Sequence, residues 1–293
     1  MTPNHDSSAP FSLNAAVRLL RPKQWIKNFF VFAPLVFAVR FSDDTSVINA
    51  LLAFAIFSVT SSATYVLNDL MDIEADKAHP VKSKKRPLAA GDISQKHGWI
   101  LFTLLILLSL AGLTLLPAIS LAIIGYLALT IAYSTFLKHQ AVWDLFTIAT
   151  GFVLRVYAGA MAIDVPVSSW MFITTFSLAL FLASMKRRQE LRTTGDTARK
   201  VLRTYTEASV DKFAEISATS TLIFYSFFVM SERPELVMTL PFVLFGLFRY
   251  WHLAEQDSLT ESPTDAVTKD WQLLAAIVGW CVASSLALSS QFL

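Results

Sequence analysis

Long apolar runs separated by short polar segments form the main pattern along this chain of 293 residues. A helix needs roughly 20 apolar residues to cross about 30 Å of hydrocarbon, and most of the runs approach or exceed that length. We therefore predict an all-α, polytopic membrane bundle that forms one integral membrane domain over residues 1–293, with a polar N-terminal tail at 1–12. The nine predicted membrane-spanning helices lie near residues 24–41, 46–69, 98–117, 118–137, 141–163, 168–185, 213–231, 235–254 and 271–291.

Prolines and polar segments refine the boundaries of these helices. Pro34 predicts a kink in the first one, because proline removes a helical hydrogen bond. Pro117 leaves room only for a tight hairpin between the third and the fourth. Residues 258–268 are predicted to form a polar loop, and residues 1–12 lack the apolar core of a signal peptide.

Composition supports a membrane protein and excludes several other classes. Hydrophobic residues make up 54% of the chain and charged residues only 16%, whereas a soluble globular chain has about 25% charged residues. A mean hydropathy of +0.52 agrees with this. A soluble enzyme, a disordered chain and a nucleic-acid-binding protein are therefore poor fits, and no nucleic-acid partner is expected. Cys281 is the only cysteine, so a disulfide framework and a CxxC metal site are excluded.

The 24 Lys and Arg residues gather on one side of the predicted membrane. Basic residues mark cytoplasmic connections, so this bias places the N-terminus in the cytoplasm. Only Arg40 and Arg233 fall on the opposite side, and Arg155 lies within a predicted span. The same bias supports an odd number of crossings, which places the C-terminus on the other side of the membrane.

An acidic cluster ends the second predicted span. Asp69, Asp72 and Asp76 are spaced three and four residues apart, so they share one face of a helix. Three carboxylates on one face repel each other unless a cation lies between them, and Mg²⁺ takes such oxygen ligands while bridging to substrate phosphates. Asn68 is placed to complete the coordination or to hold a water molecule. The alternative is a solvated helix end paired with the lysines that follow, but charge at the end of an apolar span is usually functional.

A basic run, Lys82-Ser83-Lys84-Lys85-Arg86, follows the acidic cluster directly. Such a run is often a topology signal or a contact to anionic lipid. Next to a metal cluster it has a second use, because Lys and Arg neutralise the outer oxygens of a diphosphate. We therefore include Lys85 and Arg86 among the candidate phosphate-binding residues.

The run from Asn68 to Asp76 with Lys85–Gly91 resembles the first signature of the UbiA superfamily of intramembrane prenyltransferases. The nine-helix architecture of that family agrees with the predicted spans over essentially the whole chain. Typical members carry a second acidic motif at the end of the sixth span, where this chain has Lys186-Arg187-Arg188-Gln189-Glu190. One interpretation of this basic run is a topology anchor in which Glu190 pairs with Lys186.

Further segments resemble one branch of the superfamily, the phosphoribosyltransferases that act on decaprenyl phosphate. These segments are Arg21–Asn28, Tyr133–Lys138, Asp144–Ala160, Phe248–Tyr250 and Ser262–Asp270. The resemblance implies transfer of 5-phosphoribose from phosphoribosyl diphosphate to a polyprenyl phosphate, with release of diphosphate. It implies Mg²⁺ held by Asp69, Asp72 and Asp76, of which Asp69 and Asp72 are the catalytic pair. It also implies the inner membrane of a bacterium, with membrane lipid around the protein and the site facing the cytoplasm.

That reaction brings about six negative charges into one cavity, and a basic run in place of a second acidic cluster suits such a load. The candidate phosphate-binding residues are Lys23, Lys27, Lys85, Arg86, Tyr133, Lys138, Arg155, Lys186 and Arg187. Consecutive helical positions are about 100° apart, so we expect Lys186 and Arg187 to face the cavity and Arg188 to anchor the topology.

Two charged residues of the fifth predicted helix, Asp144 and Arg155, each have more than one possible role. Asp144 and Arg155 share a face but lie about 16 Å apart along the axis, so they do not bond directly. Arg155 either pairs with a carbonyl or another helix, or it meets a substrate phosphate. Asp144 binds metal, binds a ribose hydroxyl or orients Lys138.

Two other functions compete with phosphoribosyl transfer. A prenyltransferase acting on an aromatic or porphyrin acceptor shares the first motif but predicts a second acidic cluster. A transporter predicts charges spread through the membrane depth and inverted repeats, whereas the charges of this chain collect at one face.

Overall fold

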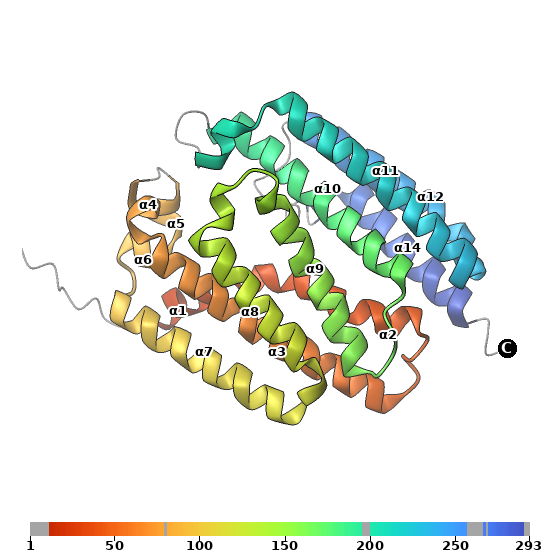
Figure 1. Cartoon of the computed structure of the whole chain (residues 1–293), viewed down its shortest axis with the longest axis horizontal. Coiled ribbons are helices and arrows are strands. Elements are labelled where there is room, and N and C mark those ends of the chain that lie inside the picture. Colours follow the sequence, from red (N-terminus) through yellow and green to blue (C-terminus); the bar gives the residue numbers. More distant parts are fainter. Residues whose placement is uncertain (1–11, 79–80, 195–199, 257–265, 268, 290–293) are drawn as a thin grey trace, which may run out of the picture.

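The computed structural model describes residues 12–78, 81–194, 200–256, 266–267 and 269–289, and each regular element in these ranges is a helix (Figure 1). The α-helices are α1 (Leu13–Leu20), α2 (Ala33–Phe37), α3 (Asp44–Met71), α4 (Ile73–Ala78), α5 (Lys82–Lys85), α6 (Pro87–Ala90), α7 (Gln95–Leu115), α8 (Ser120–Thr135), α9 (Trp143–Ala162), α10 (Ser169–Thr194), α11 (Glu207–Glu232), α12 (Leu240–Glu255) and α14 (Trp271–Ser289). The 3₁₀ segments are η1 (Pro22–Phe32), η2 (Pro117–Ile119), η3 (Leu137–His139), η5 (Lys200–Thr204) and η6 (Pro234–Thr239). Two predicted segments lie largely outside the described residues. They are the tail at 1–12, of which only Ser12 is described, and the loop at 258–268, of which Ser262 and Pro263 are among the residues not described.

Eight helices of the described chain are long and apolar enough to cross a membrane, which makes the chain an integral membrane protein with multiple spans. They correspond to eight of the nine predicted spans, and the short η2 between α7 and α8 confirms the tight hairpin. The first predicted span, at 24–41, is not among these eight, because it is not one continuous α-helix. That segment forms the eleven residues of η1 followed by the five of α2, which ends at Phe37.

The conformation of this first segment explains how it still reaches across the bundle. A 3₁₀ helix rises about 2.0 Å per residue, compared with about 1.5 Å in an α-helix. η1 and α2 together therefore extend roughly 30 Å, close to the thickness of the hydrocarbon core. Apolar length along the sequence does not distinguish the two kinds of helix.

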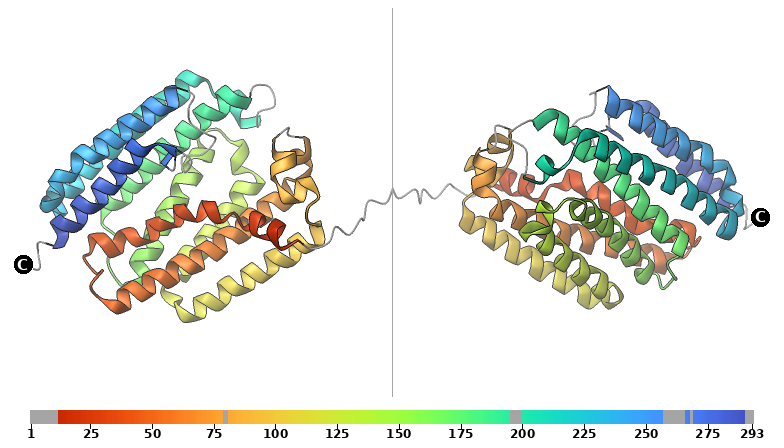
Figure 2. Two further views of the ribbon diagram at one scale, coloured as in Figure 1. Left: turned by 180° about the vertical axis from the view of Figure 1, so that it is seen from behind. Right: turned by 45° about the horizontal axis from the view of Figure 1, so that its top comes forward.

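One face of the η1–α2 segment packs into the bundle, whereas Ile26 and Phe29 on its other side are exposed. In the left view of Figure 2 it runs between α3 and α14. Gly159 of α9 makes its close approach possible, because a Cβ at this position would lie 1.9 Å from the carbonyl oxygen of Val31. At its far end the ring of Phe37 packs edge-on against Phe228 of α11 and Trp280 of α14. The segment thus joins the two halves of the bundle.

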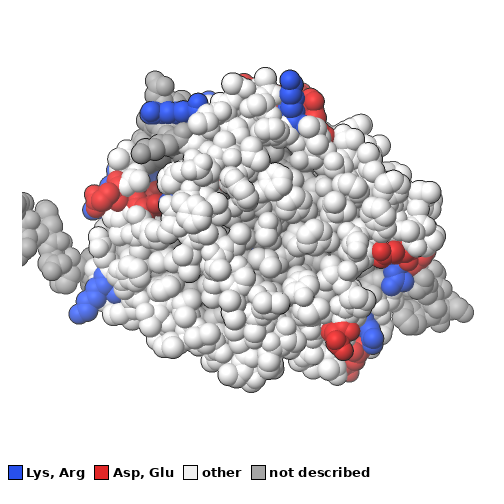
Figure 3. Space-filling view, in the orientation of Figure 1, with Lys and Arg blue, Asp and Glu red and all other residues white. Residues whose placement is uncertain are grey.

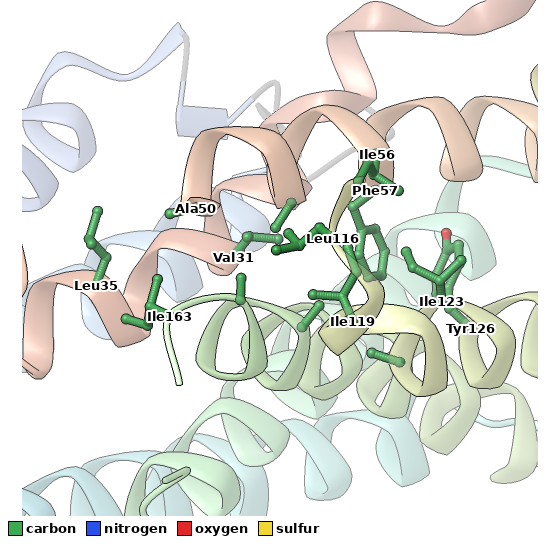
Figure 4. Packing of buried hydrophobic residues seen from close by; sticks show 14 residues of the cluster. Val31, Leu35, Ala50, Ile56, Phe57, Leu116, Ile119, Ile123, Tyr126 and Ile163 are labelled. Carbon is green, nitrogen blue, oxygen red and sulfur yellow. The ribbon is translucent and has the colours of Figure 1, made fainter. Parts of the chain in front are cut away.

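Apolar packing in the first half centres on buried residues from η1, α3, α8 and α9 (Figure 4). The rings of Phe57 and Tyr126 meet at an angle of 56° in this cluster, with their centroids 4.8 Å apart. Among the described residues on the face shown in Figure 3, charged side chains lie around the rim and the broad centre carries none. An apolar face between charged ends is what a hydrocarbon layer requires.

Candidate active site

The acidic cluster lies where α3 ends. Asp72 leaves the helical conformation, with φ −101° and ψ 10°, and separates α3 from α4. Backbone hydrogen bonds from Asp72 to Asn68 and from Asp76 to Asp72 keep the chain on a nearly helical path. The helix that carries the three aspartates is therefore interrupted at Asp72, which the sequence analysis did not expect. Asp69 and Asp76 are buried, whereas the side chain of Asp72 is 28% exposed and pairs with Lys138.

Two arginines meet the buried carboxylates. Arg21, which ends α1, and Arg86, which precedes α6, both form ion pairs with Oδ1 of Asp69. Arg86 also lies 3.4 Å from Oδ2 of Asp76, so its guanidinium joins two of the three aspartates. Nζ of Lys82 lies 3.9 Å from the other oxygen of Asp76. The basic run predicted to act with the acidic cluster is thus folded back onto it.

The third aspartate has a partner from a different part of the chain. Nζ of Lys138, in η3, donates a 2.6 Å hydrogen bond to Oδ1 of Asp72. One turn earlier on α3, Oδ1 of Asn68 accepts a bond of 3.4 Å from Ser134, near the end of α8. The structure therefore brings together Asn68, Asp69, Asp72, Asp76, Arg86 and Lys138. It adds Arg21, which the sequence analysis named only as the start of a segment that carries the resemblance.

The acidic cluster fits a hard divalent cation in its chemistry. In the described residues no three Asp, Glu, His or Cys side chains already converge on one point. Oδ2 of Asp69, however, is buried and accepts no hydrogen bond in the described part of the chain. An orphaned carboxylate oxygen is costly unless it gains a partner, and oxygen is the ligand that Mg²⁺ prefers. The oxygens of Asp69, Asp72, Asp76 and Asn68 therefore suit Mg²⁺ as ligands. They become available when the Lys and Arg side chains that now pair with the aspartates bind other anions instead.

The basic run at the end of α10 lies in a second cluster. Arg187 is 1% exposed, and its Nε donates a 2.6 Å bond to Asp144 of α9. The same guanidinium pairs with Glu190 and donates to the hydroxyl of Tyr133 at 3.2 Å. The guanidinium of Arg187 is therefore neutralised by two carboxylates, those of Asp144 and Glu190. The geometry places Arg187 inside the protein, whereas the sequence analysis expected it to face a cavity.

The two neighbours of Arg187 differ from each other. Arg188 is buried as well, with Nε 2.6 Å from Asp211 of α11 and Nη1 donating to the carbonyl of Ala254. Lys186 is 34% exposed and lies 3.7 Å from Glu190, the pair that the anchor interpretation predicted. Lys186 is thus the member of the run with an accessible ammonium group.

Asp144 has a different partner from the one that we considered. It is fully buried and does not orient Lys138, which pairs with Asp72. Instead its carboxylate binds Arg187 and accepts a 2.6 Å hydrogen bond from the hydroxyl of Tyr205. Burial and this bond raise the pKa of Tyr205 above its ordinary value. The sequence analysis missed Tyr205, because no local pattern links it to a carboxylate 61 residues away.

Arg155 lies deep in the bundle among neutral partners. Its guanidinium donates to Oδ1 of Asn28 at 2.8 Å, to the carbonyl of Gly151 at 2.7 Å and to the hydroxyl of Tyr126 at 3.2 Å. It also lies over the rings of Phe57, Tyr126 and Phe152, at 4.9, 4.9 and 5.4 Å from their centroids. This matches the interpretation in which Arg155 pairs with a carbonyl and another helix.

The remaining candidates lie apart from these contacts. Lys23 and Lys85 are exposed, and Lys27 is half-buried on η1. The two charged clusters are neighbours, because the consecutive residues Tyr133 and Ser134 of α8 contact Arg187 and Asn68 respectively. The arrangement can hold a strongly anionic group beside the end of α3.

Comparison with known proteins agrees with this architecture. Residues 29–266 match the UbiA prenyltransferase family. A decaprenyl-phosphate phosphoribosyltransferase of Mycobacterium tuberculosis is 32% identical over 290 residues, which cover 93% of this chain and 94% of that protein. The enzyme of the same name from Mycolicibacterium smegmatis is 34% identical over 242 residues, 78% of this chain and 74% of that protein.

A solved structure shares the fold. The UbiA homologue from Archaeoglobus fulgidus bound to DMAPP and Mg²⁺ has a TM-score of 0.71 and 21% identity, over 95% of this chain and 98% of that one. The matched residues, the helical fold and the acidic end of α3 all agree, and we conclude that this chain belongs to the UbiA prenyltransferase family.

Proposed function

We propose that the protein transfers 5-phosphoribose from phosphoribosyl diphosphate to a polyprenyl phosphate of the decaprenyl type and releases diphosphate. The observation that carries the proposal is the cluster at the end of α3. Three carboxylates there meet Arg21, Arg86, Lys82 and Lys138, whose side chains all remain partly exposed. Such cations can exchange a carboxylate for a phosphate oxygen without crossing the protein interior.

Binding of the donor is an exchange of ion pairs. Arg86 and Lys138 turn from Asp69 and Asp72 to the oxygens of the donor diphosphate, because a diphosphate carries more charge than a carboxylate. The carboxylates of Asp69, Asp72 and Asp76, once released, would hold Mg²⁺, with Asn68 beside them. When bound, Mg²⁺ neutralises the charge that grows on the diphosphate leaving group.

The chemical step is one displacement at C1 of the ribose. An oxygen of the polyprenyl phosphate forms the new bond to C1, while the bond from C1 to the diphosphate oxygen breaks and its electron pair leaves with the diphosphate. The attacking phosphate is already anionic, so no general base is needed. The cations around the α3 end stabilise the departing charge and hold the donor in line. The anomeric centre is inverted.

Two observations favour this reaction over prenyl transfer to an aromatic or porphyrin acceptor. The acids near the end of α10, Asp144 and Glu190, are engaged by Arg187 and are not arranged as a second metal cluster in the described residues. The relatives that cover most of this chain carry the name decaprenyl-phosphate phosphoribosyltransferase. A transporter is less favoured, because the charged contacts around α3 gather at one end of the bundle.

The decisive experiment offers membranes containing the protein a labelled phosphoribosyl diphosphate with either decaprenyl phosphate or 4-hydroxybenzoate. We expect label in the lipid phase only with the polyprenyl phosphate, and only with Mg²⁺ present. The matched control is the Asp69→Asn variant at equal expression. Transfer of an isoprenoid from its diphosphate to 4-hydroxybenzoate, with no labelled lipid, would establish the competing reaction.

We further propose that the site faces the cytoplasm across the inner membrane of a bacterium, where a soluble anionic donor is available. This predicts that a cysteine in the connection 81–94 is labelled from the cytoplasmic side and one added after Leu293 from the opposite side. Both are introduced into a Cys281→Ala background, because Cys281 is exposed. Labelling of the two positions from the same side contradicts this topology.

A further inference from the structure

The turn that leads into α9 contains a strained residue. Val142 adopts φ 70° and ψ −47°, immediately before the first residue of the helix. These dihedrals are close to those of the classic γ-turn, which is rare and strained. A β-branched side chain makes a positive φ more costly still. Such a conformation persists only where its surroundings hold it, and strained positions of this kind gather at functional sites.

One side chain holds this turn in place. The hydroxyl of Tyr205 accepts a 2.6 Å hydrogen bond from the backbone N–H of Val142 and donates one of 2.6 Å to Oδ1 of Asp144. The ring is buried with Val201, Leu202 and Val210, which belong to the segment before α11 and to α11 itself. Tyr205 therefore ties the start of α9 to a part of the chain about 60 residues later.

The turn carries a residue of the proposed site. Lys138 lies in η3, between the end of α8 and Val142, and its Nζ reaches Asp72 at 2.6 Å. The backbone N–H of Asp144 also donates to the carbonyl of Gln140, so α9 begins directly on this turn. The conformation of Val142 thus sets the angle between α9 and the turn that carries Lys138.

We infer that Tyr205 is a positioning residue that holds Val142 in its strained conformation and thereby keeps Lys138 directed at the phosphate-binding end of α3. The inference rests on the proposed function only in that Lys138 turns to the donor diphosphate. Without the Tyr205 hydroxyl, Val142 relaxes to a negative φ, and the turn carries Lys138 away from Asp72. Tyr205 itself touches no substrate in this assignment.

The first test measures the Tyr205→Phe variant of the full chain. The KM for phosphoribosyl diphosphate and the Kd for inorganic diphosphate with Mg²⁺ should each rise about 10-fold, while kcat changes less than about 3-fold. The matched control is Tyr225→Phe, which removes another buried hydroxyl, bonded to Thr239 and Trp280, in a cluster at the other end of α11. An equal rise in KM in the control would overturn the positioning role.

A second substitution that relieves the strain at Val142 should restore the KM of Tyr205→Phe. A general structural role of Tyr205 does not predict this rescue. Glycine adopts a positive φ without the Cβ penalty, so adding Val142→Gly to Tyr205→Phe should return KM to within about 3-fold of wild type. A double variant as weak as Tyr205→Phe alone contradicts the mechanism. In addition, Tyr205→Phe should add little to Lys138→Met, because both remove the same contact. Fully additive effects would show that Tyr205 acts by another route.

A measurement without substrate separates this inference from the proposed function. Hydrogen exchange of the amides in residues 136–144 should accelerate in Tyr205→Phe and remain unchanged in Tyr225→Phe. Unchanged exchange in Tyr205→Phe overturns the inference, whatever reaction the enzyme performs. Faster exchange with weaker binding of magnesium diphosphate supports it even if the wild type transfers no phosphoribose, in which case only the proposed function fails.

Discussion

The ends of α3 and α10 both carry three charges of one sign, but the structure uses them differently. At the end of α3, Asp69, Asp72 and Asp76 are met by cations from α1, η3 and the segment around α5 and α6. Those cations keep part of their surface exposed. At the end of α10, Arg187 and Arg188 are buried and pair with Asp144 of α9, Glu190 of α10 and Asp211 of α11.

The difference shows that the position of the partner decides the role of a charge. A buried pair with both members enclosed, such as Arg187 with Asp144, cannot separate without leaving a charge in a medium of low dielectric constant. Partly exposed cations can change partners, because water or a phosphate replaces what they leave. We therefore propose that substrate binds at the end of α3 and that most of the end of α10 is structural.

The largest effect should come from the acidic cluster. Asp69→Asn or Asp72→Asn should remove nearly all turnover without lowering the thermal stability, because each variant loses a metal ligand. Glu74→Gln, an exposed acid of α4 paired only with Lys77 among the contacts described, is the control and should keep wild-type activity. If either aspartate variant retains more than about a tenth of the rate at saturating Mg²⁺, a loss below ~1.4 kcal/mol, the metal role is wrong.

The second effect concerns stability at the other helix end. Asp144→Asn leaves the buried guanidinium of Arg187 with less opposing charge, and breaking such a pair costs about 3–5 kcal/mol. The midpoint of thermal unfolding in detergent should fall markedly. Asp92→Asn removes an ion pair of 3.0 Å that lies on the surface, and it should cost at most about 1 kcal/mol. Equal midpoints for the two variants would contradict the comparison of the two ends.

Features encoded by neighbouring residues could be predicted from the sequence. Eight spans follow from apolar length, and the acidic cluster follows from a spacing within one helix end. The first segment could not be predicted in detail, because hydropathy is the same for a 3₁₀ and an α-helix. The decisive contacts join distant residues: Arg21 with Asp69, and Tyr205 with Asp144. A basic run likewise does not reveal whether carboxylates from other helices already enclose it.

The third effect tests geometry at the α3 end rather than charge. Arg86→Lys keeps the positive charge but loses the planar fork that reaches both Asp69 and Asp76. We expect kcat/KM to fall about 10-fold, or ~1.4 kcal/mol, with unchanged stability. Lys84→Arg, at an exposed position of the same basic run, is the control. A fall in stability without a fall in kcat/KM would make Arg86 a structural residue like Arg187.

The smallest effect concerns the one residue that breaks the pattern at the α10 end. Lys186 is partly exposed, so among the three basic residues it is the one that can meet a sugar or lipid phosphate. Lys186→Met should raise the KM for phosphoribosyl diphosphate about 3- to 10-fold, since a partly solvated charged hydrogen bond contributes less than the 1.5–3 kcal/mol of a buried one. Lys212→Met, at an exposed position of α11, controls for the loss of one positive charge.

A donor lacking the 5-phosphate identifies what Lys186 contacts. If the ammonium group binds the 5-phosphate, this analogue is already a weak substrate for the wild type and loses nothing further in Lys186→Met, because the variant removes a contact that the analogue cannot make. If both donors are weakened equally, Lys186 contacts the lipid phosphate or the diphosphate instead. If neither donor is affected, the end of α10 is structural throughout, and all phosphate binding belongs to the α3 end and its partners.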